Sequence, residues 1–453
     1  TSQPLATEAG LRTLRRGATA TDAAEAVAAA LQVTKPGLTG LGGDAFFLYY
    51  EVSSGTVFGY NGSGRTPAAL TMERALDVAE DGALPDYHPY TVTVPGAADA
   101  WGALHARFGV LDLASVLEPA VELAGGGFPV PPMTALWWAT GAERQLAAHR
   151  HGGELMIEGR APRPGELFRN PGLARVLESL GSDGPGVIYR GLVGERIVAA
   201  VEEAGGLLSL SDLEAHQGEW VSPISIEYNG YRVHECPPNG QGLAALLALQ
   251  TYRELAPEDE GEKIHAKVEA MRLGFADAAA LVADSDHAPV PTGELLSGAY
   301  ASERARTVDL HRRIANAAPG YVPPGRAGDD TVYFCVVDEE GNGCSFINSN
   351  FMGFGTGIVP EGCGFSVQNR GRGFVLSADH PNALAPGKRP YHTIIPGLIT
   401  ELSSEDQAES AGALAAVFGV MGGMMQPQGH LQVASAPIDD GLDPQSALNL
   451  PRF

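Results

Sequence analysis

Residues 331–350 carry the feature that most constrains the fold, a hydrophobic hairpin that starts abruptly at the end of a loop. The preceding segment 313–330, RIANAAPGYVPPGRAGDD, holds three prolines and three glycines and predicts an exposed, mobile connector. Two strand-like runs, 331–337 and 343–350, then flank DEEGN, whose Gly-Asn pair supplies turn chemistry. The sequence therefore predicts a strand whose first residue, Thr331, lies at the junction between a loop and a sheet.

The register of this hairpin follows from pairing residue 337 with residue 343. The numbers of any two residues that lie opposite each other in the hairpin then sum to 680. Thr331 therefore lies opposite Ser349. Cross-strand partners on one face of a sheet have Cβ atoms about 4.5–5.5 Å apart, which predicts two hydroxyl groups facing each other. A routine Thr–Ser cross-strand pair is the alternative, and the hairpin alone favours it.

Thr331 becomes chemically interesting if the chain is cut immediately before it. A threonine hydroxyl is a weak nucleophile that needs a base, and a freed α-amino group has a pKa of about 7.7–8.0. One residue would then supply both the nucleophile and the base, a known variant of the catalytic triad. A mobile linker that ends at this bond is what such a cut would leave behind.

Helices dominate the chain before the connector and strands dominate after it. Thr21 is expected to cap an alanine-rich helix, and an apolar strand that begins within LTGLGGDAFFLYYEV returns as TVFGY. Further helices are predicted at 97–108, 114–125, 195–204, 241–254 and 263–283, and after the connector strands at 331–337, 343–351, 364–368, 391–400 and 413–420, with a short helix at 426–436. The two segments are expected to complete one sandwich.

The balance of charge narrows the classes of partner. The formal net charge is −24, whereas nucleic acids and anionic membrane surfaces both require clustered basic side chains. We therefore expect neither nucleic acid nor a membrane as partner. The longest apolar run, 411–425, is too short to span a bilayer, and no secretory signal is visible, so a cytoplasmic location is expected.

The cysteines and the short motifs argue against a metal or nucleotide site. Four cysteines are scattered without C-x-x-C spacing. The sequence contains neither H-E-x-x-H nor G-x-x-x-x-G-K-[ST]. We therefore expect no metal and no cofactor.

Several motifs resemble those of the γ-glutamyltranspeptidase family. After the connector, the similar stretches are TVYFCVVDEEGN, FGTGI at 354–358, PGKRP at 386–390 and MGGM at 421–424. Before it, ATEAGLRTLRRGATATDAAEAV, LTGLGGDAFFL and YRVHECPPNGQG resemble the large subunit of that family. The resemblance covers essentially the whole chain, and several of its motifs are specific.

The resemblance implies an α+β fold, the four-layer αββα sandwich of N-terminal nucleophile hydrolases, made as one chain that cleaves itself before a threonine. The scissile bond would be Asp330–Thr331, with Thr331 as the nucleophile. The cut would separate a large-subunit segment, 1–330, from a small-subunit segment, 331–453. Small subunits of the family usually continue through further strands, so the resemblance also implies a small-subunit segment truncated at its C-terminus.

Three further catalytic residues are implied by the resemblance. Ser349 matches the second family hydroxyl, which hydrogen-bonds the nucleophile and agrees with the predicted register. Gly422 and Gly423 match the pair whose backbone N–H groups hold the oxyanion. Two glycines between a strand and a helix can direct N–H donors at a developing negative charge, although a Gly-Gly pair alone predicts only a tight turn.

Substrate recognition is where the sequence departs from the family. Arg65 matches the arginine that grips the substrate α-carboxylate, a task that suits the bidentate guanidinium group. The aspartate that binds the α-amino group falls at Gly373, and other departures are Val332, Tyr333, Phe351, His392 and Thr393. This pattern resembles the branch that contains glutaryl-cephalosporin acylases and small-amide hydrolases. A different pocket is expected, lined by Gln368, Asn369, Arg370, His392, Thr393 and His430; purely structural roles are the alternative for the Asn-Arg pair and for His430.

The leading hypothesis is a self-processing amidohydrolase or acyltransferase that cleaves γ-glutamyl or related acyl amides through an acyl-Thr331 intermediate. One alternative is an acylase for substrates without an α-amino group, and another is a non-catalytic relative that stays uncut. The expected partners are a small-molecule amide and the two subunits of the chain itself, with a homodimer left open.

Overall fold

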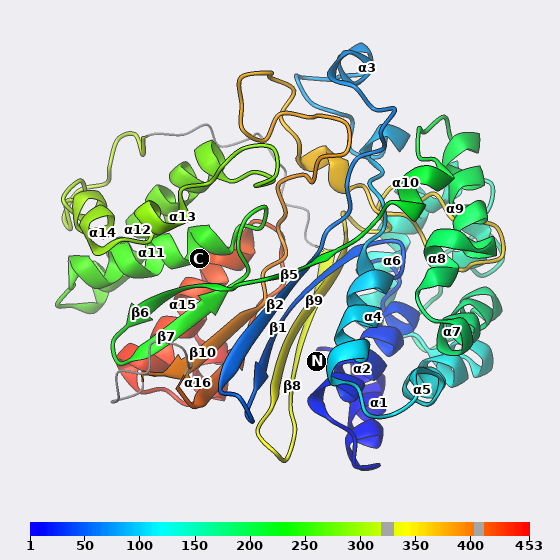
Figure 1. Cartoon of the computed structure of the whole chain (residues 1–453), viewed down its shortest axis with the longest axis horizontal. Helices are drawn as coiled ribbons and strands as arrows, with labels where there is room; N and C mark the ends of the chain where they lie inside the picture. The colour runs from blue at the N-terminus through cyan, green and yellow to red at the C-terminus, as the bar shows by residue number, and fades with distance from the viewer. Residues whose placement is uncertain (319–329, 403–411) are drawn as a thin grey trace.

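Two antiparallel sheets lie face to face between two sets of helices (Figure 1). The computed structural model describes residues 1–318, 330–402 and 412–453. The first sheet has the order β5-β2-β1-β9-β8, and the second has the order β11-β10-β7-β6. Each sheet takes strands from both sides of the connector, which confirms the predicted αββα sandwich.

The strands of the first sheet are β1 (Asp44–Glu51), β2 (Thr56–Gly62), β5 (Glu219–Val221), β8 (Asp330–Val337) and β9 (Gly343–Phe351). Those of the second sheet are β6 (Ile224–Tyr228), β7 (Tyr231–Glu235), β10 (Gly397–Glu401) and β11 (Leu414–Phe418). A separate two-stranded pair is formed by β3 (Phe128–Pro129) and β4 (Leu167–Phe168).

Strand β1 lies at the centre of the first sheet and is buried on both faces. Alternate side chains of a strand point to opposite faces. Phe46 and Leu48 pack in the apolar layer between the sheets, together with Ile347 and Leu398. Phe47 belongs instead to the core beneath the first helical layer. The unbroken apolar run AFFLYY therefore suits a strand that is covered on both sides.

The helices that flank the first sheet surround α2, all of whose residues are buried. Its many alanines allow close approach of the sheet and of neighbouring helices. These helices are α1 (Pro4–Leu14), α2 (Ala20–Thr34), α4 (Ala97–Phe108), α5 (Leu113–Gly126), α6 (Pro132–Arg144), α7 (Pro171–Asp183), α8 (Gly186–Arg190), α9 (Leu192–Glu203) and α10 (Leu210–Glu214).

The second sheet packs on helices from both sides of the connector, with α15 beside α11 and α12 (Figure 1). The helices on this side are α11 (Gly242–Leu255), α12 (Glu260–Leu281), α13 (Thr292–Leu295), α14 (Gly298–Ala305), α15 (Met425–Asp440) and α16 (Pro444–Asn449). Short helices in the loops are α3 (Met72–Asp77), η1 (Pro89–Thr91), η2 (Leu146–Ala148), η3 (Gly152–Leu155) and η4 (Arg370–Gly373). No helix in the described ranges is long and apolar enough to cross a membrane.

Two local predictions were wrong. The N-cap of α2 is Thr19 and not Thr21, because the Asp22 carboxylate returns to the Thr19 N–H at 3.0 Å and closes a capping box. Residues 364–368 form no strand: Val367 exchanges backbone hydrogen bonds with the loop at 356–358, whereas the next N–H, of Gln368, donates to Gly42 O at 2.8 Å. The predicted connector lies mostly outside the described residues.

Candidate active site

The hairpin has the predicted register. Opposed residues run from Val332 with Asn348 to Val337 with Gly343, and their numbers sum to 680. An irregularity follows at the start of β8, next to Thr331. Thr331 Oγ1 nevertheless donates a hydrogen bond to Ser349 Oγ at 3.2 Å, and only 1% of Thr331 is exposed. The two hydroxyl groups meet, as the hairpin predicted.

Ser349 Oγ is the point at which several donors converge. Besides Thr331, it accepts hydrogen bonds from the Phe351 N–H at 2.9 Å and from Arg370 Nη2 at 3.1 Å. Phe351 has a φ of 79°, a left-handed conformation that is rare for a bulky side chain. This conformation accompanies the hydrogen bond from the Phe351 N–H, which helps to hold Ser349 Oγ beside Thr331.

Arg370, on η4, links Ser349 with the segment that leads into β10 of the second sheet. Its Nη1 donates to Thr393 Oγ1 at 2.8 Å, and its guanidinium lies 4.3 Å from the centre of the Phe351 ring. The side chain is fully buried, and this burial lowers the pKa of Arg370 to about 9. The group therefore still carries its positive charge at neutral pH, one hydroxyl away from Thr331.

Asp44, the first residue of β1, is the acidic centre of this region. Its Oδ1 accepts hydrogen bonds from Gly64 N–H, Gly96 N–H and the Gln368 side chain at 2.9–3.1 Å. Its Oδ2 lies 3.0 Å from His392 Nε2. Burial opposes ionisation, but the bond from His392 and the charge of Arg370 hold the pKa of Asp44 below its ordinary value. Asp44 is thus a buried carboxylate with four partners.

His392 is held in a neutral form. Its Nδ1 accepts a hydrogen bond from Ile394 N–H at 3.3 Å, so that Nε2 carries the hydrogen that is donated to Asp44. Complete burial and the charge of Arg370 lower the pKa of His392 to about 4, although Asp44 opposes this shift. His392 is therefore a positioning group for Asp44 at neutral pH and not a cation.

This lowered pKa predicts a difference in acid stability between the wild type and His392→Gln. Between pH 6.5 and 4 a histidine in the unfolded chain binds a proton, whereas His392 in the folded protein stays neutral. Because the unfolded state binds more protons, the free energy of unfolding falls as the pH falls through this window. Glutamine keeps an N–H donor for Asp44 and does not titrate. Urea unfolding at pH 7.0 and 4.5 should show a loss that is about 2–3 kcal/mol larger for the wild type. Equal losses would show that folded His392 protonates normally.

Gly422 and Gly423 lie between β11 and α15, with φ values of 119° and 53°. Both values favour glycine. Within the described ranges, neither of their N–H groups meets an acceptor. The buried Gln241 amide donates to Gly423 O at 2.8 Å and to Thr393 O at 2.7 Å, which ties this turn to the segment that carries Thr393. The turn therefore offers two adjacent unused donors beside the network.

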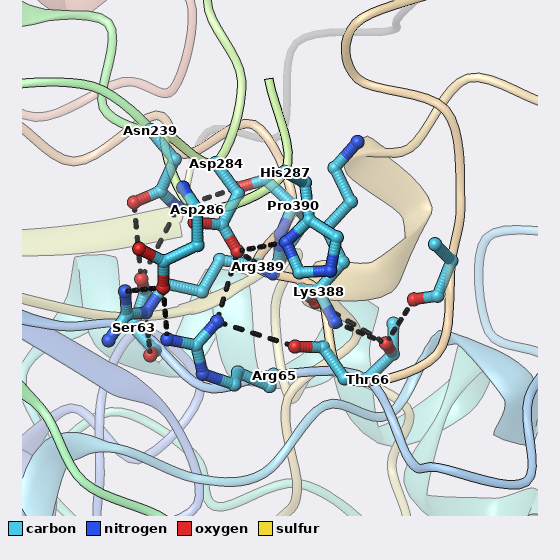
Figure 2. Close-up of polar contacts among 12 residues, drawn as sticks. Ser63, Arg65, Thr66, Asn239, Asp284, Asp286, His287, Lys388, Arg389 and Pro390 are labelled. Carbon is cyan, nitrogen blue, oxygen red and sulfur yellow. Dashed lines mark hydrogen bonds and ion pairs between the residues drawn. The ribbon is translucent and has the colours of Figure 1, made fainter. Parts of the chain in front are cut away.

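Arg65 does not present an open guanidinium in this structure. Its Nη1 is 3.1 Å from Asp284 Oδ2 and its Nη2 is 2.8 Å from Asp286 Oδ2, as Figure 2 shows. A third contact runs from Nη1 to Gly387 O. Binding of a substrate carboxylate by Arg65, which the resemblance implied, stays a prediction and would compete with these two aspartates.

The remaining predicted pocket residues have structural partners. Asn369 donates to Asp86 O at 2.7 Å and accepts from Met352 N–H at 3.2 Å. His430 lies inside α15, where its Nδ1 is 2.5 Å from Glu235 Oε1. The structure therefore joins four predicted residues in a chain of hydrogen bonds that runs from Thr331 through Ser349 and Arg370 to Thr393. It leaves Arg65, Asn369 and His430 engaged elsewhere.

Sequence reasoning missed Asp44 and Gln241. Both lie within motifs that the sequence analysis quoted, LTGLGGDAFFL and YRVHECPPNGQG. A lone carboxylate at the start of an otherwise apolar strand was the available signal for Asp44. Together the site offers two facing hydroxyl groups, a buried cation and unused backbone N–H donors, and hydroxyl groups and backbone donors of this kind are suited to acyl transfer.

Comparisons with known proteins identify the family of this chain. A sequence model of the Gamma-glutamyltranspeptidase family matches residues 6–453. A Bacillus subtilis (strain 168) protein, named glutathione hydrolase-like YwrD proenzyme, is 34% identical over 99% of this chain and 83% of its own length. The oxamate amidohydrolase proenzyme of Klebsiella pneumoniae is 32% identical, with the same 99% and 83% covered.

A solved structure extends the agreement to the fold. The crystal structure of cephalosporin acylase from Bacillus halodurans has a TM-score of 0.89 and 43% sequence identity, with 100% of this chain and 82% of that chain covered. The family match and this structural match both extend across nearly the whole described chain. The chain therefore belongs to the γ-glutamyltranspeptidase family of self-processing N-terminal nucleophile hydrolases.

Proposed function

We propose that this chain is cut between Asp330 and Thr331 and then hydrolyses amides whose acyl group lacks an α-amino group. The observation that carries the proposal is the buried contact of Thr331 Oγ1 with Ser349 Oγ, which in turn accepts from Arg370. The positive charge of Arg370 favours withdrawal of the proton from the Thr331 hydroxyl, the step that makes this oxygen nucleophilic. The cut would leave segments 1–330 and 331–453 as the two subunits.

The reaction would run in two steps. In the first, Thr331 Oγ1 bonds to the amide carbonyl carbon, and its proton passes to the freed α-amino group of the same residue and then to the leaving amine as the C–N bond breaks. In the second, water attacks the ester, the α-amino group takes its proton, and the carboxylic acid leaves as the Thr331 hydroxyl re-forms. The N–H groups of Gly422 and Gly423 would stabilise the oxyanion in both steps.

Two observations on the described residues support acyl groups without an ammonium. A Cβ atom at Gly373 would lie 2.8 Å from Tyr391 O, so no carboxylate fits at this position without a backbone shift. Asp44 is already occupied by four donors. The names of two relatives point the same way, since oxamate is an amide without an α-amino group and the solved neighbour is called a cephalosporin acylase.

The test compares glutaryl-p-nitroanilide with γ-glutamyl-p-nitroanilide, which differ only in the α-amino group. Processed protein should turn over the glutaryl compound with a kcat/KM that is about tenfold higher or more, because the extra ammonium would be desolvated without a partner. Release of p-nitroaniline measures both rates. A preference for the γ-glutamyl compound would exclude the proposed acyl class and leave Thr331 chemistry intact.

A further inference from the structure

Arg370 differs from the other arginines on the loops around Thr331. Those arginines each have a carboxylate partner: Arg65 has Asp284 and Asp286, Arg372 has Asp86, and Arg389 has Glu219. Among the side chains that the structure describes, no carboxylate oxygen lies within 4.0 Å of the Arg370 guanidinium. A fully buried cation with only neutral hydrogen-bond partners is costly to maintain.

The donors of Arg370 are also incompletely used. A guanidinium carries five N–H donors. One bond goes from Nη1 to Thr393 and one from Nη2 to Ser349, while the buried Nε finds no acceptor among the described residues. Asp44 contributes a balancing charge from further away, but its own oxygens already accept from four groups. Arg370 thus has both charge and donors to offer a ligand.

The geometry limits where that ligand can bind. The Phe351 ring covers one face of the guanidinium, with 4.3 Å between them, so that an anion must approach along the plane that contains the N–H groups. Only two hydrogen bonds, of 3.1 and 3.2 Å, separate Arg370 from the Thr331 oxygen that would attack the amide. An anion on Arg370 would therefore lie within a few bonds of the reacting carbonyl carbon.

Building on the proposed function, we propose that Arg370 binds a carboxylate of the acyl group, and that the substrates are half-amides of short dicarboxylic acids. The spacer between carboxylate and scissile carbonyl would range from a direct bond, as in an oxamic amide, to the three methylenes of a glutaryl amide. Longer acyl groups would have to fold back between Thr331 and Arg370. Arg65, already paired with Asp284 and Asp286, is not needed for this contact.

The test uses processed enzyme and two isosteric anilides, glutaryl-p-nitroanilide and its neutral analogue, in which a carboxamide replaces the carboxylate. The wild type should favour the anionic compound in kcat/KM by roughly 100-fold, the size expected for one buried charge pair. Arg370→Gln removes the charge but keeps a polar N–H₂ group, and it should reduce this ratio to a few-fold. Arg370→Lys should give an intermediate ratio, because it keeps the charge without the fork.

Arg372→Gln is the matched control, since Arg372 lies on the same η4 turn but pairs with Asp86. It should keep the wild-type ratio. Competition by glutarate against its monoamide on the wild type needs no variant, and it decides the matter if Arg370→Gln fails to process. Equal turnover of both anilides together with no inhibition by glutarate would overturn the inference while the proposed function stands. An intact chain without activity on either anilide would instead overturn the proposed function.

Discussion

Thr331→Ala is expected to remain a single chain and to show no measurable amidase activity. The substitution removes the hydroxyl that donates to Ser349 at 3.2 Å, and with it both the proposed attack on the preceding peptide bond and the attack on substrate. Loss of a covalent nucleophile typically reduces kcat by about 10⁴-fold or more. Although Thr331 is buried, the change removes only a hydroxyl and a methyl group, so the fold should persist.

Mass spectrometry of the purified proteins checks this prediction. The wild type should yield a fragment that begins at Thr331, whereas the alanine variant should yield only the intact mass. Thr331→Ser is the control, because it keeps a hydroxyl in place and should still be processed, though more slowly. Full activity of the alanine variant, or a cut at another bond, would remove Thr331 from the proposed mechanism.

Asp44→Asn should have the largest effect on stability. The carboxylate accepts four hydrogen bonds without being exposed, and it is the described acid whose charge offsets Arg370. Asparagine keeps the shape of the side chain but removes its charge. Its N–H₂ group would also face some of the N–H donors that now bind the Asp44 carboxylate. Leaving a buried charge uncompensated costs about 3–5 kcal/mol.

Chemical denaturation at pH 7 measures this loss, and activity should fall with it as Ser349 and Arg370 lose their positions. Asp443→Asn is a matched control, since that exposed residue caps α16 and asparagine caps equally well, so a change of under about 0.5 kcal/mol is expected. A loss of less than 1 kcal/mol for Asp44→Asn would mean that Arg370 is balanced by another group.

Contacts between residues close in sequence were predictable, whereas contacts between residues far apart in sequence were not, as Ser349 and Arg65 show. Ser349 is 18 residues from Thr331 on the same hairpin, so turn chemistry and strand alternation were enough to predict that the two hydroxyls face each other. Arg65 and Asp284 are 219 residues apart, and nothing in either neighbourhood indicates their ion pair. The same limit explains the missed Asp44, whose bond to His392 spans 348 positions.

The sequence by itself determined the hairpin and its register, because the alternation of apolar residues and the turn residues act over a few neighbours. The αββα class of sandwich followed from the motifs that resemble the family. The sequence did not determine which cation near Thr331 is open to a ligand. That depends on which carboxylates the packed sheets and loops bring within hydrogen-bond distance, and only the tertiary structure places Asp284 and Asp286 on Arg65 while leaving Arg370 with Ser349 and Thr393. An ion pair depends on a short distance between two charged side chains, and residues far apart in the chain reach that distance only in the folded structure.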